Sequence, residues 1–129
     1  MFKAYLIGNR VLSNAAEALS LYEKSRFGEK FENKIQYSLV EALYLLKRGR
    51  MEIFKNNRKI SDDAFSNFVE KKEKNSFACY SVYSALRERG YIVKTALKFG
   101  ADFRVYEKAQ NQERSMQNGL FLLFMRHPP

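Results

Sequence analysis

The stretch GYIVKTALKFGADFRVY, residues 90–106, predicts two β-strands joined at its second glycine. Valine, isoleucine, tyrosine and phenylalanine, which favour strands, recur on both sides of that glycine. Because side chains alternate across a strand, Phe103 and Val105 are expected on one face. Arg104 and Tyr106 then share the other face. The stretch therefore places a tyrosine beside a cation, away from the core side of the predicted sheet.

A helix is predicted over residues 76–89, directly before this stretch. Apolar side chains recur there at the spacing of an amphipathic helix, and Gly90 follows as a C-terminal signal. Cys79 lies on the apolar stripe and is interpreted as a core residue. As the single cysteine of the chain it can form no internal disulfide, and it has no companion for a zinc site.

The N-terminal region predicts alternating strands and helices. Short apolar segments flank a Gly-Asn dipeptide at residues 8–9, a pattern typical of a β-hairpin. A helix capped by Ser13 or Asn14 is expected to run to about residue 25, with Gly28 as its stop signal.

A second helix in this region has the clearest local signal. Ser38 and Glu41 have the spacing of a capping box, and leucines repeat at helical spacing after them. A strand is predicted over residues 51–54, and a polar turn over residues 56–59. Ser61 and the acids that follow it predict the start of a third helix.

The charged run at residues 70–75 is taken as a domain boundary. The apolar stripe disappears there, as expected for the exposed end of the third helix or for a linker between two lobes. This boundary divides an N-terminal domain, residues 1–72, from a C-terminal domain, residues 73–129. The predicted fold class is α/β (α+β), with a small mixed N-terminal lobe followed by a second, incomplete α/β lobe.

Composition favours a soluble protein with a polyanionic partner. The 129 residues include 23 Lys and Arg against 14 Asp and Glu, a net charge of +9, which favours nucleic acid over a merely basic surface. No apolar run approaches the ~20 residues of a membrane span, and the start lacks a signal-peptide pattern. We therefore expect a cytoplasmic, metal-free protein with no cofactor and no membrane contact.

Two motifs, taken together, resemble a known family. They are SLVEALYLLKRG at residues 38–49 and LRERGYIVKTALKFGADFRVY at residues 86–106. In order and separation they are similar to the archaeal tRNA-intron splicing endonucleases, over about residues 1–109. The resemblance implies an α/β subunit with a small N-terminal domain and a nuclease-like C-terminal domain. It also implies dimers or tetramers that cut precursor tRNA at bulge-helix-bulge sites.

The chemistry implied by the resemblance needs a base, an acid and a cation. A tyrosine acts as general base on the ribose 2′-hydroxyl, a histidine protonates the leaving 5′-oxygen, and a lysine stabilises the phosphorane. The products are a 2′,3′-cyclic phosphate and a 5′-hydroxyl, and no metal takes part.

Only the tyrosine of that set carries over to this sequence, as Tyr106. The histidine is expected in the loop just downstream, where the nearest polar residues are Gln117 and Asn118, whose amides cannot deliver a proton. His127 is the only histidine, and it is interpreted as a tail residue beyond the apolar run at 120–125. The lysine is expected on a later strand, and the sequence ends before one.

A basic cluster on the two predicted strands is expected to follow an RNA backbone, although a solvated strand face is the plainer alternative. Its members are Lys94, Lys98, Arg104 and Lys108. The apolar run at 120–125 predicts a strand covered on both faces, either by a partner chain or by the helix at 76–89.

These observations predict a C-terminally shortened, non-catalytic member of the family. Loss of a general acid typically costs ~10²- to 10⁴-fold in rate, so cleavage by this chain alone should be feeble. We expect a structural and RNA-docking subunit within a hetero-oligomer, and we expect that hetero-oligomer to be a tetramer. Its partners are then a catalytic endonuclease subunit and precursor tRNA. Two alternatives stay open: an independently active, metal-free RNase that uses Tyr106, and a stand-alone RNA-binding module. Whether the chain is itself an enzyme is therefore undecided by the sequence.

Overall fold

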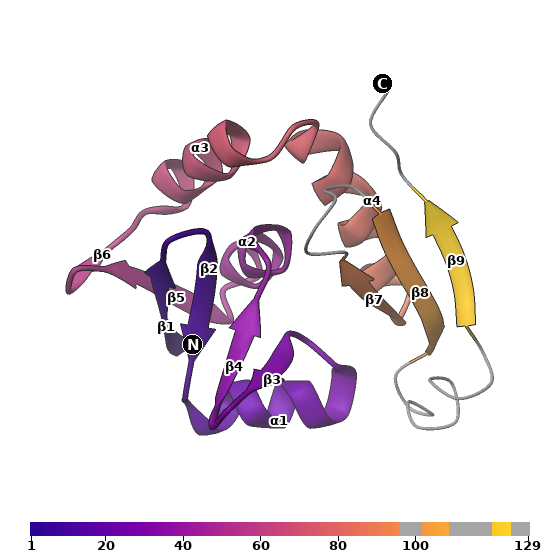
Figure 1. Cartoon of the computed structure of the whole chain (residues 1–129), viewed down its shortest axis with the longest axis horizontal. Coiled ribbons are helices and arrows are strands. Elements are labelled where there is room, and N and C mark those ends of the chain that lie inside the picture. Colours follow the sequence, from indigo (N-terminus) through magenta and orange to yellow (C-terminus); the bar gives the residue numbers. More distant parts are fainter. Residues whose placement is uncertain (96–101, 109–119, 125–129) are drawn as a thin grey trace.

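The computed structural model describes residues 1–95, 102–108 and 120–124, which form two β-sheets and four helices (Figure 1). The strands of the N-terminal sheet are β1 (Phe2–Ile7), β2 (Arg10–Ser13), β3 (Glu29–Phe31), β4 (Lys34–Tyr37), β5 (Met51–Lys55) and β6 (Arg58–Lys59). The strands of the C-terminal sheet are β7 (Tyr91–Thr95), β8 (Asp102–Lys108) and β9 (Leu120–Phe124). The helices are α1 (Ala16–Ser25), α2 (Leu39–Lys47), α3 (Asp62–Lys72) and α4 (Ser76–Glu88). This architecture confirms the predicted α/β class.

The N-terminal sheet has the strand order β3-β4-β2-β1-β5-β6. Its centre is the predicted hairpin of β1 and β2, and β5 then pairs parallel to β1. The predicted polar turn at 56–59 is too long, because Arg58 and Lys59 already form β6 and pair with β5. Asn56 and Asn57 both adopt positive φ, 50° and 67°, so the chain reverses within two residues, as a tight hairpin turn requires.

The start of α1 also differs from the prediction. Neither Ser13 nor Asn14 caps the helix; Ala15 occupies the N-cap position, without a side-chain cap. Ser13 is buried at the end of β2, where its hydroxyl donates to the carbonyl oxygen of Lys3 at 2.7 Å and accepts from the N–H of Ala15 at 3.2 Å. The hydroxyl therefore ties two strands to the beginning of the helix.

Gly28 lies in the loop that follows α1, two residues beyond the left-handed C-cap at Arg26. Its φ of +84° disfavours any other residue, and a Cβ added there would lie 2.5 Å from Cγ2 of Ile35. Ile35 belongs to the hairpin of β3 and β4, which the sequence did not predict and which contacts this loop.

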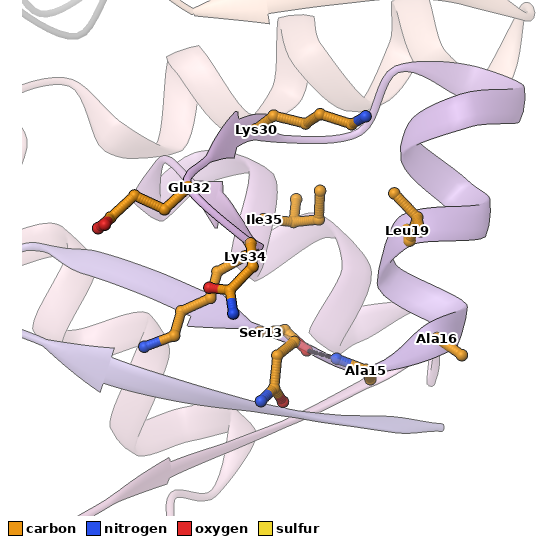
Figure 2. Close-up of a pocket in the computed structure, with 10 residues that line it drawn as sticks. Ser13, Ala15, Ala16, Leu19, Lys30, Glu32, Lys34 and Ile35 are labelled. Atoms are coloured by element: carbon orange, nitrogen blue, oxygen red, sulfur yellow. Dashed lines mark hydrogen bonds between the residues drawn. The ribbon is translucent and has the colours of Figure 1, made fainter.

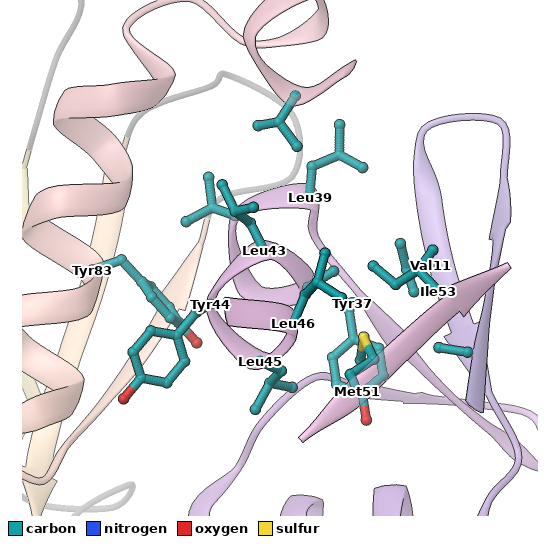
Figure 3. Packing of buried hydrophobic residues seen from close by; sticks show 14 of the residues in the cluster. Val11, Tyr37, Leu39, Leu43, Tyr44, Leu45, Leu46, Met51, Ile53 and Tyr83 are labelled. Carbon is teal, nitrogen blue, oxygen red and sulfur yellow. The ribbon is translucent and has the colours of Figure 1, made fainter. Parts of the chain in front are cut away.

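Helix α2 forms the centre of the molecule. Its predicted capping box is confirmed: Ser38 and Glu41 exchange hydrogen bonds between side chain and backbone. Figure 3 shows α2 between Tyr83 on α4 and the sheet residues Val11 and Ile53. Because both sides are covered, eight of its nine residues are buried.

The C-terminal sheet has the order β7-β8-β9, and all its pairs are antiparallel. The predicted helix before it is confirmed as α4, and the ring centroid of Tyr83 on α4 lies 6.1 Å from that of Phe103 on β8. As predicted, Phe103 and Val105 are buried on the core side. The first strand was predicted to continue to residue 99, and residues 96–99 lie outside the described part. The apolar run at 120–125 supplies β9, the outer strand of this sheet.

The two predicted domains share one continuous core in the structure. The buried cluster extends from Phe2 and Ala4 in the N-terminal sheet to Val93 and Val105 in the C-terminal sheet. The predicted boundary falls between α3 and α4, where the chain passes from one sheet to the other. The division into residues 1–72 and 73–129 stays a prediction.

Candidate functional site

Tyr106 lies in the middle of β8, paired with Ile92 on β7 and with Leu120 on β9. Its side chain is only 8% exposed, although alternation along the strand places it on the face away from Phe103 and Val105. Tyr106 therefore offers little surface to a substrate.

Arg104 is the exposed cation nearest to Tyr106 along β8. It points to the same side of the strand, two residues before the tyrosine, and it is exposed as predicted. Arg104 and Tyr106 therefore share one face of β8, as the alternation pattern predicts. For Lys108 it describes only the backbone, in β8 opposite Tyr91. Four residues considered above lie outside the described part: Lys98, Gln117, Asn118 and His127.

Lys94 has surroundings unlike those expected of an RNA-binding lysine. Its side chain is 8% exposed, and its ammonium group donates to the carbonyl oxygens of Arg26 at 2.8 Å and Gly28 at 2.5 Å. It also forms an ion pair with Glu29 at 2.9 Å. An ammonium group has three donors, and all three are used here. This is a correction: Lys94 faces the loop after α1, because β7 is the edge strand next to the N-terminal lobe.

Glu41 adds a buried carboxylate to this loop. One oxygen accepts the backbone N–H of Ser38 at 3.1 Å as part of the capping box, and the other accepts the N–H of Gly28 at 3.0 Å. The second oxygen also lies 3.8 Å from the ammonium of Lys94. The carboxylate is 4% exposed, so a cation and two N–H donors offset the cost of removing its charge from water.

Arg87 on α4 binds the same loop from the neighbouring element. Its guanidinium donates to the carbonyl oxygens of Ser25 at 2.7 Å and Arg26 at 3.1 Å, and it lies 3.8 Å from the ring centroid of Phe27. The last carbonyls of a helix lack intrahelical partners and carry partial negative charge, so a cation there is favourable. We call Glu41, Arg87 and Lys94 the clasp, because together they tie the end of α1 to α4 and β7.

The sequence signal for the clasp was present in part. Cys79, Tyr83 and Arg87 follow one another at spacings of four, so Arg87 continues the buried stripe of α4, and its Nε donates to the hydroxyl of Tyr83 at 3.3 Å. Burial raises the pKa of the Tyr83 hydroxyl, which therefore stays a neutral acceptor. The partners of Arg87 are 61 and 62 residues away in sequence, and helical spacing cannot identify them.

A separate pocket of about 310 Å³ lies between the start of α1 and the β3–β4 hairpin. Figure 2 shows Leu19 and Ile35 along its wall, with Lys30 and Lys34 around it and the Ser13 to Ala15 hydrogen bond at its base. None of its lining residues is a histidine or a cysteine. The pocket belongs to the N-terminal lobe, whereas Tyr106 lies on β8 of the other sheet.

Two searches of the described residues were negative. They contain no group of three His, Cys, Asp or Glu side chains that could hold a metal ion. None of the helices α1 to α4 has the length and apolar character needed to cross a membrane.

Comparison with known proteins gives matches along most of the chain. The family model described as tRNA intron endonuclease, N-terminal domain, matches residues 2–66. The one described as tRNA intron endonuclease, catalytic C-terminal domain, matches residues 77–117.

Three similar proteins are each described as a tRNA-splicing endonuclease. The one from Thermococcus gammatolerans is 41% identical over 113 residues, which cover 87% of this chain and 67% of that protein. The one from Thermococcus kodakarensis is 42% identical, covering 84% and 65%. The one from Methanothermobacter thermautotrophicus is 38% identical, covering 79% and 60%. The chain therefore spans about two thirds or less of the length of these relatives.

Proposed function

The chain belongs to the tRNA intron endonuclease family, and from this premise we propose that it is a structural and RNA-docking subunit of a tRNA-splicing endonuclease. In this proposal a partner subunit of the same family supplies catalysis. The complex, a hetero-oligomer and in the simplest case a tetramer, acts on precursor tRNA at bulge-helix-bulge sites.

The observation that carries the proposal is the state of Tyr106. We identify it with the tyrosine of the family's catalytic set, and the residue is only 8% exposed. Residues 107–126 contain no histidine to act as the general acid. A reaction through a 2′,3′-cyclic phosphate needs a base and an acid on opposite sides of the scissile bond, and an amide cannot replace the acid.

Charge supports the docking part of the proposal. The chain has a net charge of +9, and the exposed Arg104 lies on the same strand face as Tyr106. Cations of this kind contact phosphate groups without reading sequence, so they suit a subunit that holds a folded RNA for another chain to cut. The sequence also predicts Lys98 and Lys108 as RNA contacts, whereas Lys94 belongs to the clasp.

The test combines an assembly measurement with a cleavage assay. The purified chain, a complete catalytic subunit of the family, and their mixture are each analysed by size-exclusion chromatography with mass determination. Every peak is then assayed on a precursor tRNA with a bulge-helix-bulge site. We expect a joint complex that cuts faster than the catalytic subunit alone at equal concentration. We also expect no cleavage by this chain alone.

Tyr106→Phe separates the proposal from its alternatives. In the joint complex this variant should cut as fast as the parent, because the phenol takes no part in catalysis. If the chain alone cuts and Tyr106→Phe abolishes cutting, the chain is an independent RNase. If no joint complex forms and the cleavage rate is unaffected, the chain is a separate RNA-binding module and the proposal fails.

A further inference from the structure

The N-terminal sheet has one covered face and one open face. Along β1, Phe2, Ala4 and Leu6 are buried, whereas Tyr5 and Ile7 are 42% and 60% exposed. The helices with substantial packing against this sheet, α1 and α2, contact the buried side through residues of the core. In the described part of the chain, Figure 1 shows no helix on the other side. Tyr5 and Ile7 therefore point from the middle of a six-stranded sheet toward solvent.

Two aromatic rings lie side by side on this open face. Tyr5 on β1 is the register partner of Phe54 on the parallel strand β5, and their ring centroids are 6.0 Å apart at an interplanar angle of 35°. Phe54 is half-buried by its neighbours, and the ammonium of Lys3 lies 5.6 Å from its ring centroid. An aromatic pair on adjacent strands, with a cation beside it, offers two rings on which successive bases can stack.

The charges around the rings select a polyanion as the occupant. Lys3 and Arg10 lie on β1 and β2 with the exposed face, and Lys34 lies on the same face of β4, as the strand registers require. None of these three cations forms an ion pair with a described residue. The acids of this face are already paired within the described structure: Glu52 with Lys59 at 3.1 Å, and Glu29 with Lys94 at 2.9 Å. Cations interspersed among exposed rings suit phosphates and bases better than the apolar surface of a protein.

We propose that the open face, defined by Lys3, Tyr5, Arg10, Lys34 and Phe54, binds unpaired nucleotides of an RNA. Two bases stack on Tyr5 and Phe54, and the three cations contact the phosphates on either side. The surface follows from the geometry of the sheet, whereas the choice of RNA as the ligand rests on the proposed function. The face is distinct from the β8 surface with Arg104, so the chain binds RNA at two places.

The test measures binding of the full chain to a fluorescently labelled single-stranded RNA of about 8 nucleotides and to a duplex of the same composition. Tyr5→Leu and Phe54→Leu keep an apolar side chain but remove the stacking ring. Each should weaken single-strand binding about 5- to 100-fold and leave duplex binding nearly unchanged. Phe77→Leu is the matched control, because Phe77 is an 80% exposed ring on α4, outside the sheet.

A second variant observes stacking directly. The chain has no tryptophan, so Phe54→Trp introduces a single tryptophan, whose emission can be excited selectively over that of the tyrosines, into the open face. Its emission should be quenched when single-stranded RNA is added, with affinity close to that of the parent. Lys3→Ala should flatten the dependence of log affinity on log salt concentration by about one unit.

Four results would overturn the inference. The first is that the leucine variants bind single-stranded RNA as tightly as the parent does. The second is that the Phe77→Leu control weakens binding as much as they do, and the third is that the tryptophan emission does not change when RNA is added. The fourth is that Tyr5→Leu and Phe54→Leu leave RNA binding unchanged but lower the molecular mass of the particle measured by sedimentation. The open face would then be an interface between two copies of the chain.

The failure of this inference can be told apart from failure of the proposed function. If the leucine variants lose single-strand binding while no joint complex with a catalytic subunit forms, the open face stands and the proposed function fails. If the joint complex cuts precursor tRNA and the leucine variants bind as the parent does, only the open face fails.

Discussion

Two of the contacts between the N-terminal lobe and the C-terminal lobe differ in chemistry. The first is apolar: Tyr44 on α2 meets Tyr83 on α4 edge to face, with ring centroids 5.5 Å apart. The second is the clasp, in which charged side chains hold the loop after α1. The apolar contact stabilises the fold through buried area, whose contribution hardly depends on direction. The clasp is directional, and it determines where β7, and with it the strand of Tyr106, lies relative to the N-terminal lobe.

The largest expected effect comes from the apolar contact. Tyr83 is completely buried, so Tyr83→Ala should lower the free energy of unfolding by about 3–5 kcal/mol, through lost burial and the cavity that remains. Tyr83→Phe is the matched variant, because it removes only the hydroxyl that accepts from Arg87 at 3.3 Å. That change should cost about 0.5–1.5 kcal/mol. Chemical denaturation of both variants checks the prediction, and equal losses would show that the hydroxyl, not the ring, stabilises the contact.

Helical periodicity predicted the buried stripe of α4 that takes part in the apolar contact, but it predicted neither its partner Tyr44 nor the clasp. The stripe containing Cys79 and Tyr83 was visible because helical spacing brings apolar residues onto one side. Alternation also placed Arg104 correctly as an exposed residue. Lys94 lies directly opposite Arg104 in the sheet, yet it is buried. Alternation determines the face of a strand, but it cannot reveal that an edge strand will meet a loop 66 residues earlier in the chain.

The same limit explains the missed elements of the N-terminal sheet. All three residues of β3 are exposed, so no apolar alternation marks it as a strand. Ser13 was interpreted as a cap because serine favours that position, whereas its hydroxyl instead bonds to the carbonyl of Lys3. Tyr106 shows the limit at the candidate site: the motif identified the residue, and alternation placed it on the face away from Phe103 and Val105, but neither predicts that it is only 8% exposed.

A smaller effect is expected from the clasp, and it tests whether the clasp is directional. Glu41→Gln keeps the size of the side chain, but only one of its two terminal atoms can still accept a hydrogen bond. The N–H of Gly28 or that of Ser38 then loses its acceptor, which should lower the free energy of unfolding by about 1–3 kcal/mol.

Two measurements distinguish this effect from general weakening. Glu17→Gln is the control, since Glu17 forms an exposed ion pair with Arg50 at 3.4 Å, worth about 0–1 kcal/mol. Hydrogen exchange should show faster opening of β7 in Glu41→Gln, with the middle of α2 nearly unchanged. Uniform acceleration across β7 and α2 would instead mean that Glu41 acts only through the helix cap.

The smallest effect concerns the pH dependence of the apolar contact. Burial, together with the hydrogen bond that its hydroxyl donates to Glu88, raises the pKa of Tyr44 to about 12 from an ordinary value near 10. The folded state therefore holds this proton more tightly than the unfolded state. The resulting stability is fully present below about pH 10 and is lost as the pH rises toward 12. Burial also raises the pKa of Tyr37 and Tyr83, so the parent has more than one source of alkaline instability.

Tyr44→Phe isolates the contribution of this one hydroxyl. Denaturation midpoints measured between about pH 9 and pH 12 should fall less steeply for this variant than for the parent. The difference should stay below about 1 kcal/mol, because Glu88 is half-exposed and its charge is screened by solvent. Glu88→Gln removes the carboxylate but keeps the phenol, so the pKa of Tyr44 in the folded state rises less, and the stability of this variant should also fall less steeply than that of the parent. If Tyr44→Phe and the parent lose stability in parallel, the alkaline sensitivity comes from the more deeply buried phenols. Ionisation of the Tyr44 hydroxyl beside Glu88 then does not weaken the contact between α2 and α4.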